Sequence, residues 1–180
     1  MILRSGLVGF DRSMADEFHQ LDKALDAARR FLGRDCLRFY YVDTPPLSSR
    51  PTYEAFQKAE DDEEKTAAWE ELCIDLVKYL CEKKKLASVR WGVTDVGEVE
   101  ECLLTTLVTS MAYRSPVLNE PAAKKLIEQF MKTFNALADP NSLEPTFLTP
   151  LGDLTGATFE RCFAAVTSRG LFLYLIIDED

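Results

Sequence analysis

The sequence predicts an α+β fold, in which a small, mostly antiparallel sheet with a C-terminal hairpin packs against four or five helices. Apolar residues recur with helical periodicity in several separate segments. Short runs of aromatic and β-branched residues follow the first of these segments and close the chain. Because the helices precede the final hairpin instead of alternating with strands, this order favours an α+β fold over repeated βαβ units.

The first helix is expected between Ser13 and Gly33. Ser13 can cap its start and Gly33 its end, and Arg29 and Arg30 in the last turn complement the helix dipole. Spacings of three and four residues place its apolar side chains on one face: Met14, Phe18, Leu21, Leu25, Ala28 and Leu32.

A strand, a short helix and a long helix are expected next. Cys36 to Val42 is rich in aromatic and β-branched residues and is ended by Pro45 and Pro46. Thr52 to Ala59 fits a short helix, and Asp62 to about Leu86 fits a long one. The apolar stripe of the long helix consists of Trp69, Leu72, Cys73, Leu76, Val77 and Leu80.

Two more helices follow a short extended segment at Ser88 to Val93. Asp95 and Glu98 have the spacing of a capping box, and Asn119 fits the start of the next helix, which ends before Pro140. The expected buried faces are Val99, Leu103, Leu107 and Met111 on the first helix, and Ile127, Phe130, Phe134 and Leu137 on the second.

The C-terminal part is expected to hold a long irregular connection and a hairpin. Pro140 to Ala157 contains three prolines and two glycines, and its apolar residues suggest that it packs over the core. Thr158 to Thr167 and Leu171 to Ile177 form the hairpin, with Gly170 in a left-handed position of the turn. The last run is apolar on both faces, which is typical of a central strand.

Composition predicts one domain over residues 1–180, located in the cytoplasm. The chain has 30 Asp and Glu against 21 Lys and Arg, for a net charge of −9. This charge disfavours binding to nucleic acid or to anionic membranes and favours a basic protein partner. An acidic protein without a dedicated partner is the alternative interpretation. No apolar run approaches the length of a membrane span, and the N-terminus lacks the features of a signal peptide.

Cofactors, metals and disulfides are not predicted. The five cysteines are odd in number, form no Cys-x-x-Cys pair, and fit reduced thiols. His19 is the only histidine and lies near Asp16 and Asp22 in helical spacing, which favours a surface ion pair over a catalytic role. Zinc needs several close Cys or His ligands, and phosphate-binding glycine loops are missing from the sequence.

An acidic run at the start of the long helix is the first candidate site. Carboxylates at this end and Lys83 to Lys85 at the other complement the helix dipole, so the run has a structural explanation. The dipole effect fades within one turn, and five carboxylates exceed what it requires. We therefore also expect a partner-binding surface here. The run consists of Glu60, Asp61, Asp62, Glu63 and Glu64.

Two further charge clusters were considered. The acidic C-terminus, Asp178, Glu179 and Asp180, fits a solvated chain end, but because it follows a buried strand it is held in place and is a second candidate for partner binding. Four arginines near the end of the first helix form a weaker candidate for anion binding, against the alternative of salt bridges and dipole pairing. These arginines are Arg29, Arg30, Arg34 and Arg38.

Two functions from different classes therefore remain. The first is a non-catalytic, acidic protein-binding module, such as an immunity- or antitoxin-like inhibitor of a basic protein; this is an analogy from size and charge. The alternative is a small, metal-independent enzyme that uses carboxylate and arginine side chains. A pocket with converging polar groups would favour the enzyme, and a flat or convex acidic face would favour the binding module.

Overall fold

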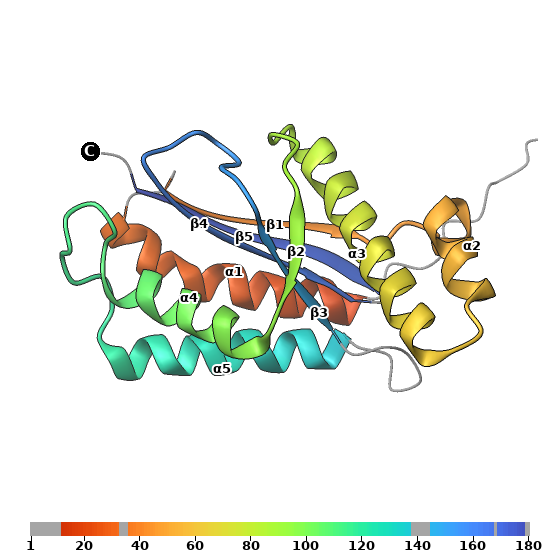
Figure 1. Ribbon diagram of the computed structural model, residues 1–180. Coiled ribbons are helices and arrows are strands. Elements are labelled where there is room, and N and C mark those ends of the chain that lie inside the picture. Colours follow the sequence, from red (N-terminus) through yellow and green to blue (C-terminus); the bar gives the residue numbers. More distant parts are fainter. Residues whose placement is uncertain (1–11, 33–35, 138–144, 168, 179–180) are drawn as a thin grey trace, which may run out of the picture.

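The computed structural model describes residues 12–32, 36–137, 145–167 and 169–178. Five strands form one antiparallel sheet in the order β1-β5-β4-β3-β2, which confirms the α+β class (Figure 1). The elements are α1 (Arg12–Leu32), β1 (Leu37–Asp43), the 3-10 helix η1 (Leu47–Ser49), α2 (Pro51–Lys58), α3 (Asp62–Lys84), β2 (Trp91–Thr94), α4 (Val96–Val108), α5 (Glu120–Leu137), β3 (Thr146–Pro150), β4 (Phe159–Val166) and β5 (Gly170–Asp178).

Helices cover both faces of the sheet (Figure 1). Helices α1, α4 and α5 cover one face and enclose what we call the three-helix core. Helix α3 covers the other face and encloses the α3 core. The amphipathic stripe of α3 faces this second core as predicted: Leu72, Cys73, Leu76, Val77 and Leu80 are fully buried, whereas Trp69 is half-buried.

Strand β5 lies between β1 and β4 and divides the two cores. Because successive side chains of a strand point to opposite faces, Phe172, Tyr174 and Ile176 enter the three-helix core. The residues between them enter the α3 core. All nine residues of β5 are buried, so the prediction of an interior strand from its two apolar faces is confirmed.

The predicted caps position α4 and α5. Asp95 accepts a hydrogen bond from the Glu98 backbone N–H at 2.9 Å, and Asn119 accepts one from Ala122 at 2.9 Å. Each bond satisfies one backbone donor that has no partner within its helix. Helix α1 already includes Arg12, so Ser13 is a helical residue and not the N-cap that was predicted. Gly33, predicted to end α1, lies outside the described residues.

Two expectations about the C-terminal part were wrong. The segment from Pro140 to Ala157 is not wholly irregular, because it contains β3, which places Phe147 and Leu148 in opposite cores. Gly170 is not left-handed and begins β5 instead. An added Cβ there would lie 2.6 Å from a ring carbon of Tyr41, so close packing rather than turn geometry requires a glycine.

Candidate functional site

The acidic run lies at the turn between α2 and α3 and serves first to start α3. Asp61 is the N-cap, and its carboxylate accepts from the Glu64 backbone N–H at 2.8 Å. The Glu64 carboxylate accepts in turn from the Glu60 N–H at 3.1 Å. Glu64 thus reaches back to the residue that precedes the N-cap, so two of the five carboxylates are used in starting the helix.

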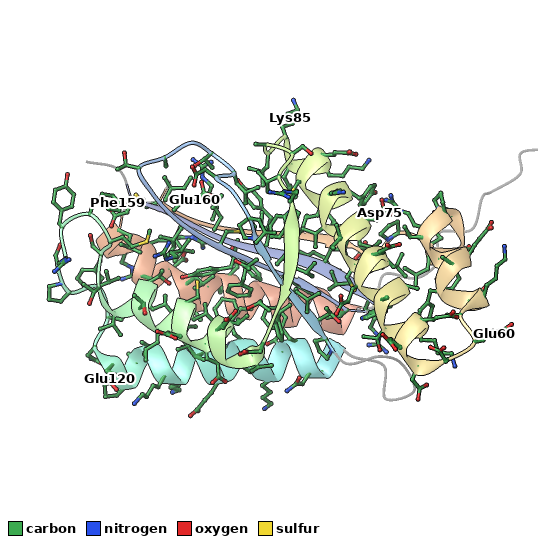
Figure 2. All side chains as sticks on the ribbon, viewed as in Figure 1. Glu60, Asp75, Lys85, Glu120, Phe159 and Glu160 are labelled. Carbon is green, nitrogen blue, oxygen red and sulfur yellow. The ribbon has the colours of Figure 1, made fainter. Side chains whose placement is uncertain are left out.

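The other three carboxylates of the run do not accept hydrogen bonds at the start of α3. Glu60, Asp62 and Glu63 are exposed, and within the described ranges their carboxylates form no ion pair or hydrogen bond. Figure 2 shows Glu60 at the tip of the α2–α3 turn, far from the Phe159 and Glu160 end of the sheet. We call these three residues the free acidic cluster.

A shallow groove adjoins the free acidic cluster. It lies between α2 and α3 and has a volume of about 330 Å³. Four alanines give it an apolar floor, with charged side chains at the rim. The lining consists of Ala55, Lys58, Ala59, Glu64, Ala67, Ala68 and Glu71. An apolar groove beside unpaired carboxylates provides both contact area and charge for a protein partner.

The acidic C-terminus contributes less than expected to this picture. Asp178 is 6% exposed, and its Oδ2 accepts from Ser110 Oγ at 2.7 Å and from the Ala112 N–H at 2.9 Å. Its carboxylate thus anchors the chain after α4 to the end of β5. Glu179 and Asp180 lie outside the described residues.

Among the four arginines of the predicted anion site, the structure gives Arg29 a clear structural role. Arg29 binds Asp22 at 2.6 Å and Asp26 at 3.1 Å, and it donates to the Leu37 carbonyl. It therefore ties the end of α1 to β1, which matches the structural alternative. Arg30 is exposed, Arg38 is half-buried, and Arg34 is outside the described residues.

A larger cleft, of about 580 Å³, opens at the other end of the sheet. It arises because β3 pairs only with Ala164–Val166 of β4, so the Phe159–Phe163 half of β4 has no described strand on that side. The end of α4, the loop after it and the β3–β4 connection form the walls. The lining residues are Thr105, Thr109, Ser110, Met111, Arg114, Asp153, Thr158, Phe159, Glu160 and Arg161.

Sequence reasoning missed this cleft. Its residues come from two stretches, 105–114 and 153–161, and neither contains a recognisable spacing motif. The only local feature in or beside them is a pair of glycines, Gly152 and Gly156, which is typical of a turn and does not indicate a binding site. The charge of Asp178 led to a prediction of partner binding. In the structure its carboxylate instead holds the loop after α4, which forms one wall of the cleft.

The thiols are poorly suited to act as nucleophiles. Burial raises the pKa of Cys73 to about 12 and that of Cys81 to about 11. Burial also raises the pKa of Cys102 to about 11, although the positive charge of Arg161 opposes this shift. Since the thiolate is the reactive form, these cysteines act as small apolar side chains at neutral pH.

The described residues contain no group of three or more His, Cys, Asp or Glu side chains arranged to hold a metal ion. Among the described helices, none is long and apolar enough to cross a membrane. In comparisons with known proteins, no family model, curated protein or solved structure matches the chain.

Proposed function

We propose that this protein is a non-catalytic binding module that docks a basic protein partner at the α2–α3 turn. The observation that carries the proposal is the free acidic cluster: Glu60, Asp62 and Glu63 are exposed carboxylates that neither cap α3 nor form an ion pair among the described residues. Like charges held together oppose folding, so a partner that neutralises them gains binding energy.

The groove beside the cluster gives the interaction its specificity. Charge complementarity speeds association, whereas an apolar contact slows dissociation. A helix with basic residues at one end and small apolar residues along one face would fit the Ala55–Ala68 groove and the carboxylates together. An immunity- or antitoxin-like inhibitor acting in the cytoplasm is the most specific form of this proposal.

The test is carbodiimide cross-linking in an extract of cells that naturally express the protein. This reagent joins a carboxylate directly to a lysine amine, so it reports carboxylates in contact with a partner. We expect a cross-linked partner whose lysines map to Glu60, Asp62 or Glu63. The variant Glu60→Gln, Asp62→Asn, Glu63→Gln should lose it, because it keeps the cap residues Asp61 and Glu64 but removes the free carboxylates.

The matched control is Glu100→Gln, Glu101→Gln, Glu128→Gln, which removes the same charge from exposed positions on α4 and α5. It should retain the partner. With the partner purified, the cluster variant should associate more slowly than the control, and this difference should shrink at high salt. Equal association rates for both variants would remove the cluster from the proposed function.

A small, metal-independent enzyme is the second candidate, and the cleft is the observation that favours it. Arg114 and Arg161 line the cleft together with the carboxylates of Asp153 and Glu160. Such groups can hold and polarise a substrate without a metal. A catalytic activity that survives in the cluster variant but is lost in Arg161→Gln would select this candidate.

A further inference from the structure

We propose that the cleft beside β4 binds a small organic phosphate, with Arg114 and Arg161 holding the phosphate group. Binding of this kind needs no subsequent reaction and does not depend on docking at the α2–α3 turn. Three features point to it: the position of each arginine, the hydroxyl groups around them, and the hydrogen bonds of the nearby carboxylates.

Arg161 reaches the cleft because of strand alternation. It lies on the same side of β4 as Phe163 and Ala165, which face the three-helix core, so its side chain points toward α4. The guanidinium is close enough to Cys102 on α4 for its positive charge to oppose the rise in the pKa of that thiol caused by burial. One of its N–H groups donates to the Glu160 carbonyl at 3.3 Å, and the others have no protein acceptor among the described residues.

Arg114 is fixed by the loop that follows α4. This loop is closed by hydrogen bonds from Ser110 N to Ser115 O at 2.9 Å and from Arg114 N to Ser110 O at 3.0 Å. The buried carboxylate of Asp178 holds the loop through Ser110 and Ala112. Arg114 itself has a φ of 52°, a left-handed conformation that is unfavourable for residues other than glycine. The loop therefore presents this arginine from a defined position.

Hydroxyl groups complete the set of donors. Thr105 and Thr109 extend from the last turn of α4, and Thr158 lies across the cleft. Within the described ranges, none of these three hydroxyls has a protein hydrogen-bond partner, and neither arginine forms an ion pair. Two guanidinium groups and three hydroxyls offer more donors than a two-oxygen carboxylate accepts, and they suit the oxygens of a phosphate.

Two carboxylates, Asp153 and Glu160, also line the cleft, and Glu160 is held by hydrogen bonds from the β3–β4 connection. Both Glu160 oxygens accept hydrogen bonds, from the backbone of Leu154 and Thr155 and from the Thr155 hydroxyl, at 2.6–2.9 Å. The last carbonyls of α4 would also repel an anion, but those of Thr105, Leu107 and Val108 accept backbone N–H groups. Among the lining carboxylates, only Asp153 has no described hydrogen bond.

The ring of Phe159 indicates which kind of chemical group is attached to the phosphate of the ligand. It lines the cleft beside Arg161, together with the side chain of Met111. An aromatic or other flat apolar group attached to the phosphate could pack on these side chains, since the cleft volume lies within the range typical of small-molecule sites. The inferred ligand is therefore a phosphate monoester with an apolar body, for which phenyl phosphate is a simple probe.

Calorimetric titration with phenyl phosphate tests the inference. Wild type should bind the probe, and Arg114→Gln and Arg161→Gln should each weaken binding by about tenfold or more, as expected for a lost charge-assisted hydrogen bond. Asp153→Asn should act in the opposite direction and tighten binding by roughly two- to fivefold, because it removes a nearby negative charge. Lys132→Gln, which removes an exposed positive charge on α5, should have no effect.

Each outcome decides the question. Both arginines are exposed, so the variants should melt at the wild-type temperature, and melting curves separate lost binding from lost folding. The proposal would be overturned if wild type showed no binding at millimolar concentrations of phenyl phosphate. It would also be overturned if the double variant Arg114→Gln, Arg161→Gln bound the probe as tightly as wild type does. Benzoate binding as tightly as phenyl phosphate would overturn the assignment to phosphate and identify a carboxylate site.

Discussion

The three-helix core and the α3 core share the same sheet but are filled by different side chains. Rings dominate the three-helix core, where the centroids of Phe134 and its aromatic neighbours lie 5.2–6.4 Å apart. Leucines dominate the α3 core, in which Trp91 is the only described aromatic residue that is fully buried. The interlocking rings of the first core are Phe130, Phe134, Phe147, Phe163, Phe172 and Tyr174.

This difference follows from the number of helices on each face. Three helices must meet one sheet, and large rings span the spaces between them. A single helix on the other face leaves less space between helix and sheet. The β4 residues buried there are accordingly small: Cys162, Ala164 and Val166. We infer that the three-helix core is the more rigidly specified side. Helix α3, whose neighbouring helix is the short α2, can shift to close a small void more readily than interlocked rings can.

The largest expected effect comes from breaking the ring cluster. Phe134→Ala should lower the free energy of unfolding by about 3–5 kcal/mol, because the cavity is bordered by four other rings. Urea denaturation measures this loss. Phe31→Ala is the control, since Phe31 is 69% exposed and its loss should change stability by less than about 0.5 kcal/mol. A loss below about 1 kcal/mol for Phe134→Ala would contradict a rigid ring cluster.

The corresponding change in the α3 core should have a smaller effect. Leu76 is fully buried beneath the single helix, and Leu76→Ala should cost about 2–5 kcal/mol, with a value near the lower end if α3 relaxes into the cavity. Lys78→Ala on the exposed face of the same helix should leave the urea midpoint almost unchanged. If Leu76→Ala costs more than Phe134→Ala, the proposed difference in rigidity is wrong.

High pH tests the burial of one titratable group in the α3 core, the thiol of Cys73. Thiols of the unfolded chain ionise near pH 9, but burial raises the pKa of Cys73 to about 12. The unfolded chain therefore loses protons first, so the stability present below pH 9 falls as pH rises toward 12, by about 1.4 kcal/mol per pH unit for one thiol. Urea titrations at pH 8 and pH 10 should show a smaller decline for Cys73→Ala than for wild type. An identical decline would exclude this thiol.

The fold was largely predictable from local patterns. The stripe of α3 and the Asp95 cap follow from spacing, and the two apolar faces of β5 follow from its uninterrupted run of large residues. Strand β3 could not be predicted in this way because Pro145 and Pro150 resemble loop residues. Pro150 is tolerated because it occupies the last position of β3.

The candidate sites divide in the same way. The acidic run was visible because its residues are consecutive, although the capping roles of Asp61 and Glu64 depend on backbone geometry. The cleft could not be predicted from the sequence because it forms where the pairing of β3 with β4 ends. That position is set by the tertiary structure and by no local pattern of residues. Arg114 and Arg161 are 47 positions apart in the sequence. They line the same cleft only because β4 carries Arg161 there and the loop anchored by Asp178 carries Arg114.

The smallest expected effect concerns the polar link inside the ring cluster. The hydroxyl groups of Tyr174 and Thr106 are 3.1 Å apart, and both side chains are buried. Thr106 also donates to the Cys102 carbonyl at 2.7 Å, so Tyr174→Phe leaves it with a partner. We expect a loss of about 0.5–1.5 kcal/mol in the free energy of unfolding, the typical net value of one hydrogen bond.

Thr106→Val should cost more, about 1–3 kcal/mol, because it leaves the Tyr174 hydroxyl buried without its partner. The double variant removes both polar groups and should recover part of that loss, which a double-mutant cycle by urea denaturation would measure. Strictly additive losses would show that the two hydroxyls act separately. The packing of the rings alone would then explain why the three-helix core is more rigid. The two cores would differ in the shape of the side chains that fill them, and the buried hydrogen bond would not contribute to the difference.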